Sequence, residues 1–309
     1  MFLTTIVVSF LGFLAWAYQN IQSPRPKICG SPDGPPVTAP RVKLRDGRHL
    51  AYQEHGVPKQ NAQNKIVFVH GFGGCRHDAA IAVETLTPKT AEDLGGVYMV
   101  SFDRPGCLPV WGCLKYILGR LAGAALLAPV VNYWWKGFPA KLCNHAYYYQ
   151  QFQRDQWALR VSHYTPWLTS FWNTQKWFPA SSVLARSLDV LSPQDKEILL
   201  KPPPKKIPYN LDLPSQQGEA ESVHRDLKVG FGTWEFSPLD LENPFPNNEA
   251  SVHLWHGDED LMVPVTLQRY IAQQLPWIHY HEIPGAGHFF PQAYGKSDAI
   301  FTALLTHKK

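Results

Sequence analysis

Residues 65–74 read KIVFVHGFGG and decide the fold class of this chain. The first five, Lys65–Val69, form a short apolar run rich in β-branched side chains, which is typical of a strand buried on both faces. The glycines that follow indicate a sharp turn. A helical stretch is expected over residues 76–93, ended by a Gly-Gly pair, and a second apolar strand over 97–102. This β–α–β order predicts a parallel sheet within an α/β fold.

Further strands and helices are expected on both sides of this unit. The hairpin at residues 41–55 has Asp46-Gly47 as its turn. The remaining predicted elements are a helix end at 110–118, a strand at 121–130, a strand at 252–255, a helix at 265–275, a strand at 278–283 and a final helix. Residues 132–248 carry seven of the eleven tryptophans and many prolines, and they predict an irregular helical insertion. Within it, Pro166 is expected to interrupt a helix and Ser192 to cap another.

Composition restricts the class of protein. The chain has 309 residues and a mass of 35.0 kDa, with 45% hydrophobic and 17% charged residues, which fits a globular protein with a sizeable core. The 29 basic and 25 acidic residues give a net charge of +4, spread along the chain, so nucleic-acid binding is not expected. The five cysteines form no CxxC pair, which argues against a disulfide framework or a zinc site.

The N-terminus predicts a membrane segment. Residues 2–18 carry no charge, and at about 1.5 Å per residue they reach roughly 25 Å, close to the thickness of a bilayer core. Arg25 and Lys27 follow the segment and favour a cytosolic location for the rest of the chain. Ala15-Trp16-Ala17 resembles a signal-peptide cleavage site, so a removed signal stays an alternative to an uncleaved anchor over residues 1–22. Residues 23–40 contain six prolines and predict an extended linker.

Four motifs follow predicted strands in a fixed order. They are HGFG at residues 70–73, DRPG at 103–106, GDEDLMVP at 257–264 and GAGH at 285–288. This order resembles the α/β-hydrolase superfamily, most closely its lidded, membrane-anchored plant members, over residues 41–309. The resemblance implies a mostly parallel sheet flanked by helices, with the insertion at 132–248 as a lid over a pocket for a small apolar or ester-type ligand. It implies no cofactor, and a location at a membrane of the endoplasmic reticulum or secretory pathway.

The resemblance also assigns roles to individual residues. Asp260 matches the family's acid, which accepts a hydrogen bond from an imidazole, although Asp258 and Glu259 are neighbouring alternatives. His288 matches the general base, since histidine titrates where a base is needed. Gly71 lets the backbone turn so that the N–H of Phe72 forms part of an oxyanion hole.

The nucleophile of the family is not found. No serine has glycine at both the −2 and +2 positions, and the aspartate and cysteine versions of this G-x-S-x-G elbow are absent as well. The elbow belongs after the DRPG motif, where only Cys107 to Pro109 precede the next helix. A helix of about ten residues, a strand of about five and the elbow cannot fit there. We infer that a helix, a central strand and the nucleophile are missing as one unit.

The sequence offers two alternatives to a missing nucleophile. Cys107 follows a strand end and could pair with His288, but its turn lacks the elbow geometry. A metal site is conceivable because the acidic loop at 258–260 is near four histidines, although packing roles are favoured for them: His253, His256, His279 and His281. Two functional hypotheses therefore remain open. One is a serine ester or acyl hydrolase that is inactive as written; the other is a non-catalytic ligand-binding or receptor-like protein. Low stability and solubility are expected in either case, because the gap exposes apolar surface.

Overall fold

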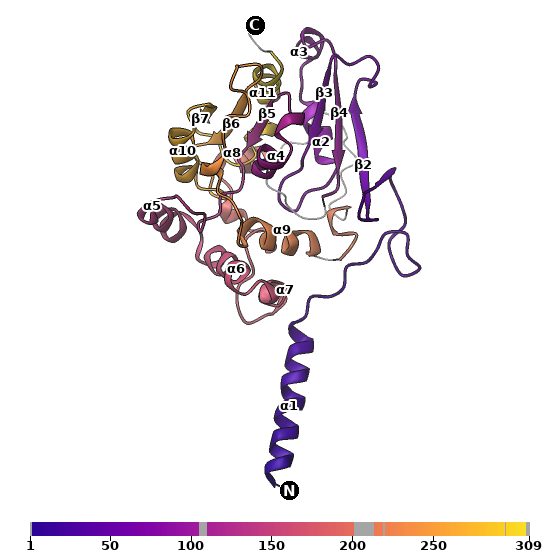
Figure 1. Cartoon of the computed structure of the whole chain (residues 1–309), viewed down its shortest axis with the longest axis vertical. Coiled ribbons are helices and arrows are strands. Elements are labelled where there is room, and N and C mark those ends of the chain that lie inside the picture. The colour runs from indigo at the N-terminus through magenta and orange to yellow at the C-terminus, as the bar shows by residue number, and fades with distance from the viewer. Residues whose placement is uncertain (1, 105–109, 201–212, 219, 294, 307–309) are drawn as a thin grey trace.

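The computed structural model describes residues 2–104, 110–200, 213–218, 220–293 and 295–306, and it shows an α/β protein with a protruding N-terminal helix (Figure 1). The strands are β1 Arg41–Lys43, β2 His49–Gly56, β3 Asn64–Phe68, β4 Val97–Phe102, β5 Ala124–Leu127, β6 Val252–Gly257 and β7 Ile278–Ile283. The helices are α1 Phe2–Ile21, α2 Asp78–Glu84, α3 Pro88–Asp93, α4 Val110–Tyr116, α5 Ala140–His145, α6 Gln153–Tyr164, α7 Thr169–Thr174, α8 Pro193–Leu200, α9 Glu221–Phe231, α10 Val265–Gln274 and α11 Lys296–Leu305.

The described strands form two separate sheets. The first has the order β1-β2-β4-β3, in which β3 and β4 are parallel and the other pairs are antiparallel. The second has the order β5-β6-β7 and is parallel throughout. The predicted hairpin and the predicted parallel β–α–β unit are both confirmed. The mostly parallel sheet, expected with a central strand missing, is found as two sheets, with β3 at an edge of one and β5 at an edge of the other.

The burial of β3 differs from the prediction. Its residues alternate between half-buried and exposed, and the side chain of Val67 is 63% exposed. A strand is buried on both faces only when neighbouring strands and helices cover it, and β3 has a strand partner on one side alone. The expectation of a strand buried on both faces is therefore wrong for β3.

The predicted helix over residues 76–93 is also divided in two. Pro88 begins α3 as its first residue, and Thr87 caps that helix by accepting a hydrogen bond from the Thr90 amide. Proline has no amide N–H and cannot continue a helix from the preceding turn, so α2 ends before it. The insertion behaves as predicted: Pro166 separates α6 from α7, and the Ser192 hydroxyl accepts from the Asp195 amide at the start of α8.

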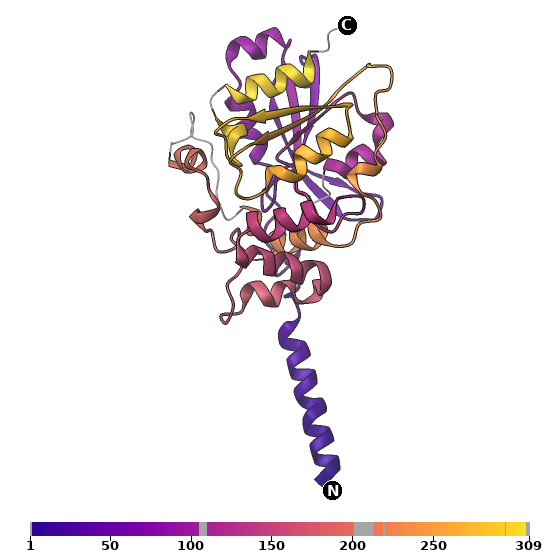
Figure 2. The same cartoon turned by 90° about the vertical axis from the view of Figure 1, so that its left-hand side faces the viewer.

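The C-terminal helix α11 connects the two sheets. Its Phe301 packs in a core with Met99 of β4, whereas its Ile300 packs in another core with Trp255 of β6. The amide of Thr87, between α2 and α3, donates to the Asp298 carboxylate at 2.9 Å. Figure 2 shows this helix in yellow in front of the strands. Helix α11 thus packs against strands of both sheets.

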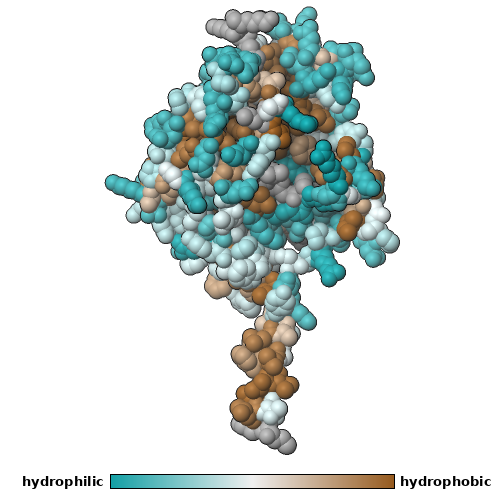
Figure 3. Space-filling view, in the orientation of Figure 1, coloured by the Kyte–Doolittle hydropathy of each residue, from teal (hydrophilic) through white to brown (hydrophobic). Residues whose placement is uncertain are grey.

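Helix α1 protrudes from the rest of the protein. Within it, Leu3–Ile21 is long and apolar enough to cross a membrane by length and composition, and none of that span is buried. A removed signal sequence passes the same test. Figure 3 shows α1 as a hydrophobic rod below a largely hydrophilic body.

Candidate active site

Two loops at the ends of neighbouring strands carry the predicted acid and histidine. Asp260 lies in the loop after β6, and His288 lies in the loop after β7. Because β6 and β7 are parallel and paired, their carboxyl ends meet at the same edge of the sheet. The Nδ1 atom of His288 lies 2.7 Å from Oδ2 of Asp260, so the imidazole donates a hydrogen bond to the carboxylate. The two motifs predicted from the sequence are therefore brought together.

Backbone groups hold the Asp260 carboxylate in one orientation. Its Oδ1 atom accepts hydrogen bonds from the amides of Met262 at 2.8 Å and Val263 at 2.9 Å. Burial raises the pKa of Asp260, but the charge and hydrogen bond of His288 and the charge of His256 outweigh it, so the pKa is lowered overall. Asp260 is therefore ionised near neutral pH, as a carboxylate that orients an imidazole must be.

The two neighbouring acids take other positions. The amide of Asp258 donates to the Ile283 carbonyl, and the amide of Glu259 donates to the Ala286 carbonyl, so the two strand-end loops are joined by their backbones. Gly257 permits this approach, because a Cβ atom there would lie 2.2 Å from the Ala286 oxygen. Of the three acids in this loop, Asp260 is the one that contacts the His288 imidazole.

A buried carboxylate from the lid positions the His288 loop. The two oxygens of Asp195 accept from the amides of His288 at 3.0 Å and Phe289 at 2.7 Å. Gly287 allows the carboxylate this close, since a Cβ atom at that position would lie 2.1 Å from Asp195 Oδ2. Sequence reasoning identified Asp195 only as part of a helix start, and the capping pattern of Ser192 carries no signal of this second role.

The imidazole of His288 faces a cavity. Its side chain is 25% exposed, and among the described residues its Nε2 atom has no hydrogen-bond partner. Burial lowers the pKa of His288, but the nearby charge of Asp260 and the hydrogen bond to it prevail, and the pKa is raised. The free Nε2 atom is the position from which a histidine base accepts a proton in Ser-His-Asp chemistry.

The predicted oxyanion loop follows β3 and is held by Arg104. His70 is buried, and burial together with the Arg104 charge lowers its pKa to about 4, so it is neutral. Its Nδ1–H donates to the Gly71 carbonyl at 3.0 Å, while its Nε2 accepts from the Arg104 amide at 3.3 Å. In the part of the chain that the structure describes, the amide N–H of Phe72 has no acceptor. It is therefore free to donate to a ligand.

Asp226 of α9 ties this loop to the lid. Its Oδ2 atom accepts from the Gly73 amide at 2.8 Å and lies 3.7 Å from the Arg104 guanidinium, with both side chains almost fully buried. Nothing in the sequence around Asp226 indicated this contact, because it joins residues 153 positions apart. The insertion at residues 132–248 thus holds both loops of the candidate site, through Asp195 on one side and Asp226 on the other.

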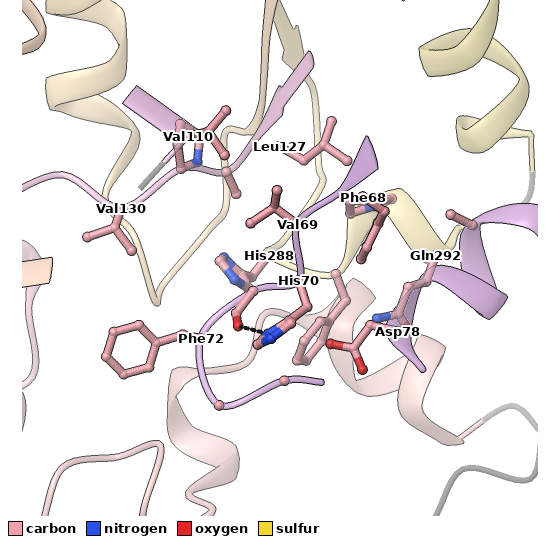
Figure 4. Close-up of a pocket in the computed structure, with 18 of the residues that line it drawn as sticks. Phe68, Val69, His70, Phe72, Asp78, Val110, Leu127, Val130, His288 and Gln292 are labelled. Carbon is pink, nitrogen blue, oxygen red and sulfur yellow. Dashed lines mark hydrogen bonds between the residues drawn. The ribbon is translucent and has the colours of Figure 1, made fainter. Parts of the chain in front are cut away.

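A large cavity occupies the space between the two sheets. Its volume is about 2810 Å³, and it is lined by the β3 edge, the β5 edge, the lid and His288. Figure 4 looks into it, with Phe68 of β3 and Leu127 of β5 on its wall together with His288, His70 and Phe72. Ordinary ligand pockets measure roughly 300–1,000 Å³, so this cavity is far larger than a pocket shaped for a small ligand.

Of the alternative site residues in the described part of the chain, His256 lies beside Asp260, with its Nε2 atom 3.4 Å from the Asp260 Oδ2 atom. Cys107, and the Pro105-Gly106 end of the DRPG motif, are outside the described residues. His253 donates or accepts a hydrogen bond with His281 at 2.9 Å, and His281 stacks on Trp255 with ring centroids 3.8 Å apart. His256 instead donates from Nε2 to the Val263 carbonyl. Among the described residues, no group of histidines, cysteines and acids is arranged to hold a metal ion.

Comparisons with known proteins give similar structures only. No family model matches the sequence, and no curated protein matches it. The chain is similar to a thermophilic esterase from Thermogutta terrifontis (15% identity, 85% of this chain and 97% of that chain, TM-score 0.48). It is also similar to an alpha/beta hydrolase fold protein from Chitinophaga pinensis (14% identity, 85% of this chain and 97% of that chain, TM-score 0.49). A third similar structure is a soluble variant of monoglyceride lipase from Saccharomyces cerevisiae (14% identity, 90% of this chain and 94% of that chain, TM-score 0.45). At these identities and TM-scores the neighbours assign no activity to the chain.

Proposed function

We propose that this chain is an α/β-hydrolase-type protein of the serine ester or acyl hydrolase kind that does not complete a catalytic cycle. The observation that carries the proposal is the bonded pair of Asp260 and His288 at neighbouring strand ends. His288 lines the same cavity as Phe72, whose amide N–H has no acceptor among the described residues. The proposal is further supported by the division of the sheet between β3 and β5, where the strand that ends in the nucleophile belongs.

The remaining residues can perform three of the four tasks of ester hydrolysis. Asp260 orients the imidazole, His288 Nε2 accepts a proton, and the N–H of Phe72 binds the oxyanion. The sequence has no G-x-S-x-G serine to supply the attacking oxygen, and within the described ranges no hydroxyl is bonded to His288. Water could take the place of the serine, but it would lack the fixed position that makes an intramolecular attack fast.

A fluorophosphonate probe and a p-nitrophenyl ester assay test this proposal. We expect no labelling and no hydrolysis above that of the His288→Ala variant, with a known serine esterase as the positive control. Labelling that disappears in His288→Ala would show that another hydroxyl or thiol is recruited, and the proposal would be wrong. Sequencing the transcript across codons 106–110 is the companion experiment. A longer form with G-x-S-x-G in that place would be an active hydrolase by the same reasoning.

The second candidate function is ligand binding without catalysis. The cavity between the sheets favours it, because it reaches His288 and is lined largely by apolar side chains such as Phe68, Leu127 and Val130. Small apolar or ester-type molecules are the ligands that such a lining would take. Titration with a fluorescent fatty acid, displaced by a monoacyl ester, should show saturable binding. Absence of binding to protein with an intact circular-dichroism spectrum would exclude this function.

We further propose that α1 is an uncleaved anchor that holds the domain at a membrane of the secretory pathway. The hydrophobic span of Leu3–Ile21 and the proline-rich linker after it support an anchor with a tether. N-terminal sequencing of the protein from membranes tests this: an intact Phe2 is expected, and a mature N-terminus after Ala17 would indicate a cleaved signal.

A further inference from the structure

Five aromatic side chains gather on one face of the lid, on α6, on α7 and in the loop after α7. Three of them are linked through ring contacts: Trp157 and Trp172 have centroids 6.0 Å apart, and Trp172 stacks on Phe178 at 5.0 Å. Phe171 and Trp177 form a second pair, with centroids 6.3 Å apart. We call this set the lid aromatic patch. It is a continuous surface rather than scattered exposed residues.

The patch is open to solvent although its residues are large and apolar. Trp177 is 78% exposed, Phe178 53% and Trp157 45%, and neighbouring Trp167 is 59% exposed. Tryptophans exposed to this extent in one area usually mark a binding surface, since burying their rings stabilises a complex. Phe171 and Trp172 are half-buried, whereas the rings of Trp157, Trp177 and Phe178 are exposed.

The position of the patch indicates what covers it. Helix α7, which carries Phe171 and Trp172, contacts α1, the hydrophobic rod of the protein. Figure 1 shows α6 and α7 at the end of the body from which α1 descends. When α1 spans a bilayer, its contact with α7 brings the lid to the membrane surface. Tryptophan and tyrosine are enriched at that depth, where the ring is apolar and its N–H or O–H reaches water.

The charges of the segment that carries the patch fit the same partner. Between Ala140 and Ser187 the acidic side chain is that of Asp155, which is half-buried and accepts from the Ser182 amide at 2.7 Å. The basic side chains in this range are more numerous: Lys141, Arg154, Arg160, Lys176 and Arg186. Lys176 lies directly before Trp177. A basic, aromatic surface is the combination that binds anionic lipid headgroups, each basic residue adding about 1 kcal/mol.

We propose that the lid aromatic patch lies in the headgroup layer of the membrane that α1 spans, so that the protein is held at two places. This proposal rests on α1 being an anchor, as proposed above. The segment immediately after the patch, from Ala180 to Leu188, lines the large cavity. The lid therefore places the wall of the cavity against the bilayer, and the ligand class that reaches the cavity by this path is a membrane-dissolved acyl lipid.

Quenching by brominated lipid tests the proposal on the full chain. The protein, with Trp16→Phe to remove the reporter in α1, is reconstituted into vesicles of dibromo-phosphatidylcholine and phosphatidylserine. Tryptophan fluorescence is compared with that in unbrominated vesicles. We expect clear quenching that falls roughly twofold or more when Trp157→Phe, Trp167→Phe and Trp177→Phe are added, because these rings carry the contact. Phenylalanine keeps the surface apolar, so these changes remove the reporter and not the binding.

A matched control and a flotation assay separate the two proposals. Trp234→Phe with Trp277→Phe, which removes tryptophans outside the patch, should leave the quenching unchanged. Lys176→Glu should reduce quenching more on vesicles with phosphatidylserine than on neutral ones. Protein that floats with vesicles but shows no quenching from the patch tryptophans overturns the lid proposal alone. Protein that does not float at all overturns the anchor and, with it, the lid proposal.

Discussion

Strands β6 and β3 are both short, apolar and parallel to a neighbour, yet all six residues of β6 are buried whereas β3 alternates between half-buried and exposed. The difference comes from their neighbours. β6 lies between β5 and β7, but β3 pairs with β4 alone. A hydrophobic run therefore predicts a strand, but the burial of that strand depends on whether neighbouring strands pair with it on both sides.

Matched truncations should show the largest contrast between the two strands. Leu254 of β6 is fully buried, so Leu254→Ala should lower the free energy of unfolding by about 2–5 kcal/mol through lost burial and a cavity. Val67→Ala on β3 removes a side chain that is 63% exposed and should cost less than about 0.5 kcal/mol. Urea unfolding of both variants measures the difference. Equal losses would mean that β3 is buried by something else.

The link between lid and oxyanion loop should give the next largest effect. Asp226→Ala leaves the Arg104 guanidinium without its carboxylate in a buried place, and it leaves the Gly73 amide without an acceptor. We expect a loss of about 2–3 kcal/mol, measured by urea unfolding. The control is Glu242→Ala, an exposed acid near the end of the insertion, which should change stability by less than about 0.5 kcal/mol. If Asp226→Ala were no less stable than Glu242→Ala, the proposed role of Asp226 would be contradicted.

The Asp260–His288 pair predicts that the free energy of unfolding depends on pH. The raised pKa of His288 stabilises the protein below the ordinary histidine value of 6.5, and this contribution is lost as pH rises through the folded-state pKa. The lowered pKa of Asp260 stabilises the folded protein at pH values above the ordinary aspartate pKa of 3.8. This contribution is lost as pH falls through the folded-state pKa. The stability difference between wild type and Asp260→Asn should therefore be greatest between those values.

We expect this difference to change by on the order of 1 kcal/mol across the window. Urea unfolding from pH 4 to pH 8 measures it. The variant Asp258→Asn is the control, because the Asp258 carboxylate does not contact His288. A flat difference for Asp260→Asn would show that the pair is not charged in the folded protein.

The smallest stability effect is expected from a charge on the open edge. Val67→Lys should change the free energy of unfolding by less than about 0.5 kcal/mol, because the side chain is already exposed. It should nevertheless slow aggregation on warming, since lysine on an edge strand opposes pairing with another chain. Light scattering during a thermal ramp measures this. Unchanged aggregation would indicate that the β3 edge is not the surface through which copies associate.

Much of the fold could be predicted because it depends on local pattern. The hairpin at residues 41–55, the strands β4, β6 and β7, and the helix break at Pro166 follow from alternation, apolar runs and proline chemistry. The hydrogen bonds of Asp195 to the His288 loop and of Asp226 to Gly73 could not be predicted. Each depends on where the insertion packs against the loops at the strand ends. The same reason explains the error at β3, where burial required a neighbouring strand.

The candidate site divides in the same way. Asp260 and His288 could be expected to pair because the GDEDLMVP and GAGH motifs resemble the acid and histidine loops of α/β-hydrolases. Gly257 and Gly287 in these loops allow a close approach that a side chain would prevent. The oxyanion loop was found through its glycines too. Its partner Arg104 lies at the end of another strand, and nothing in the HGFG motif points to it.

The carboxylate of Asp195 joins the start of α8 to the loop that carries His288. It accepts from the Ser192 amide at the first turn of α8, and it also accepts from the amides of His288 and Phe289. One carboxylate therefore fixes both the start of α8 and the loop that carries His288, so we expect a substitution of Asp195 to disturb the two segments together.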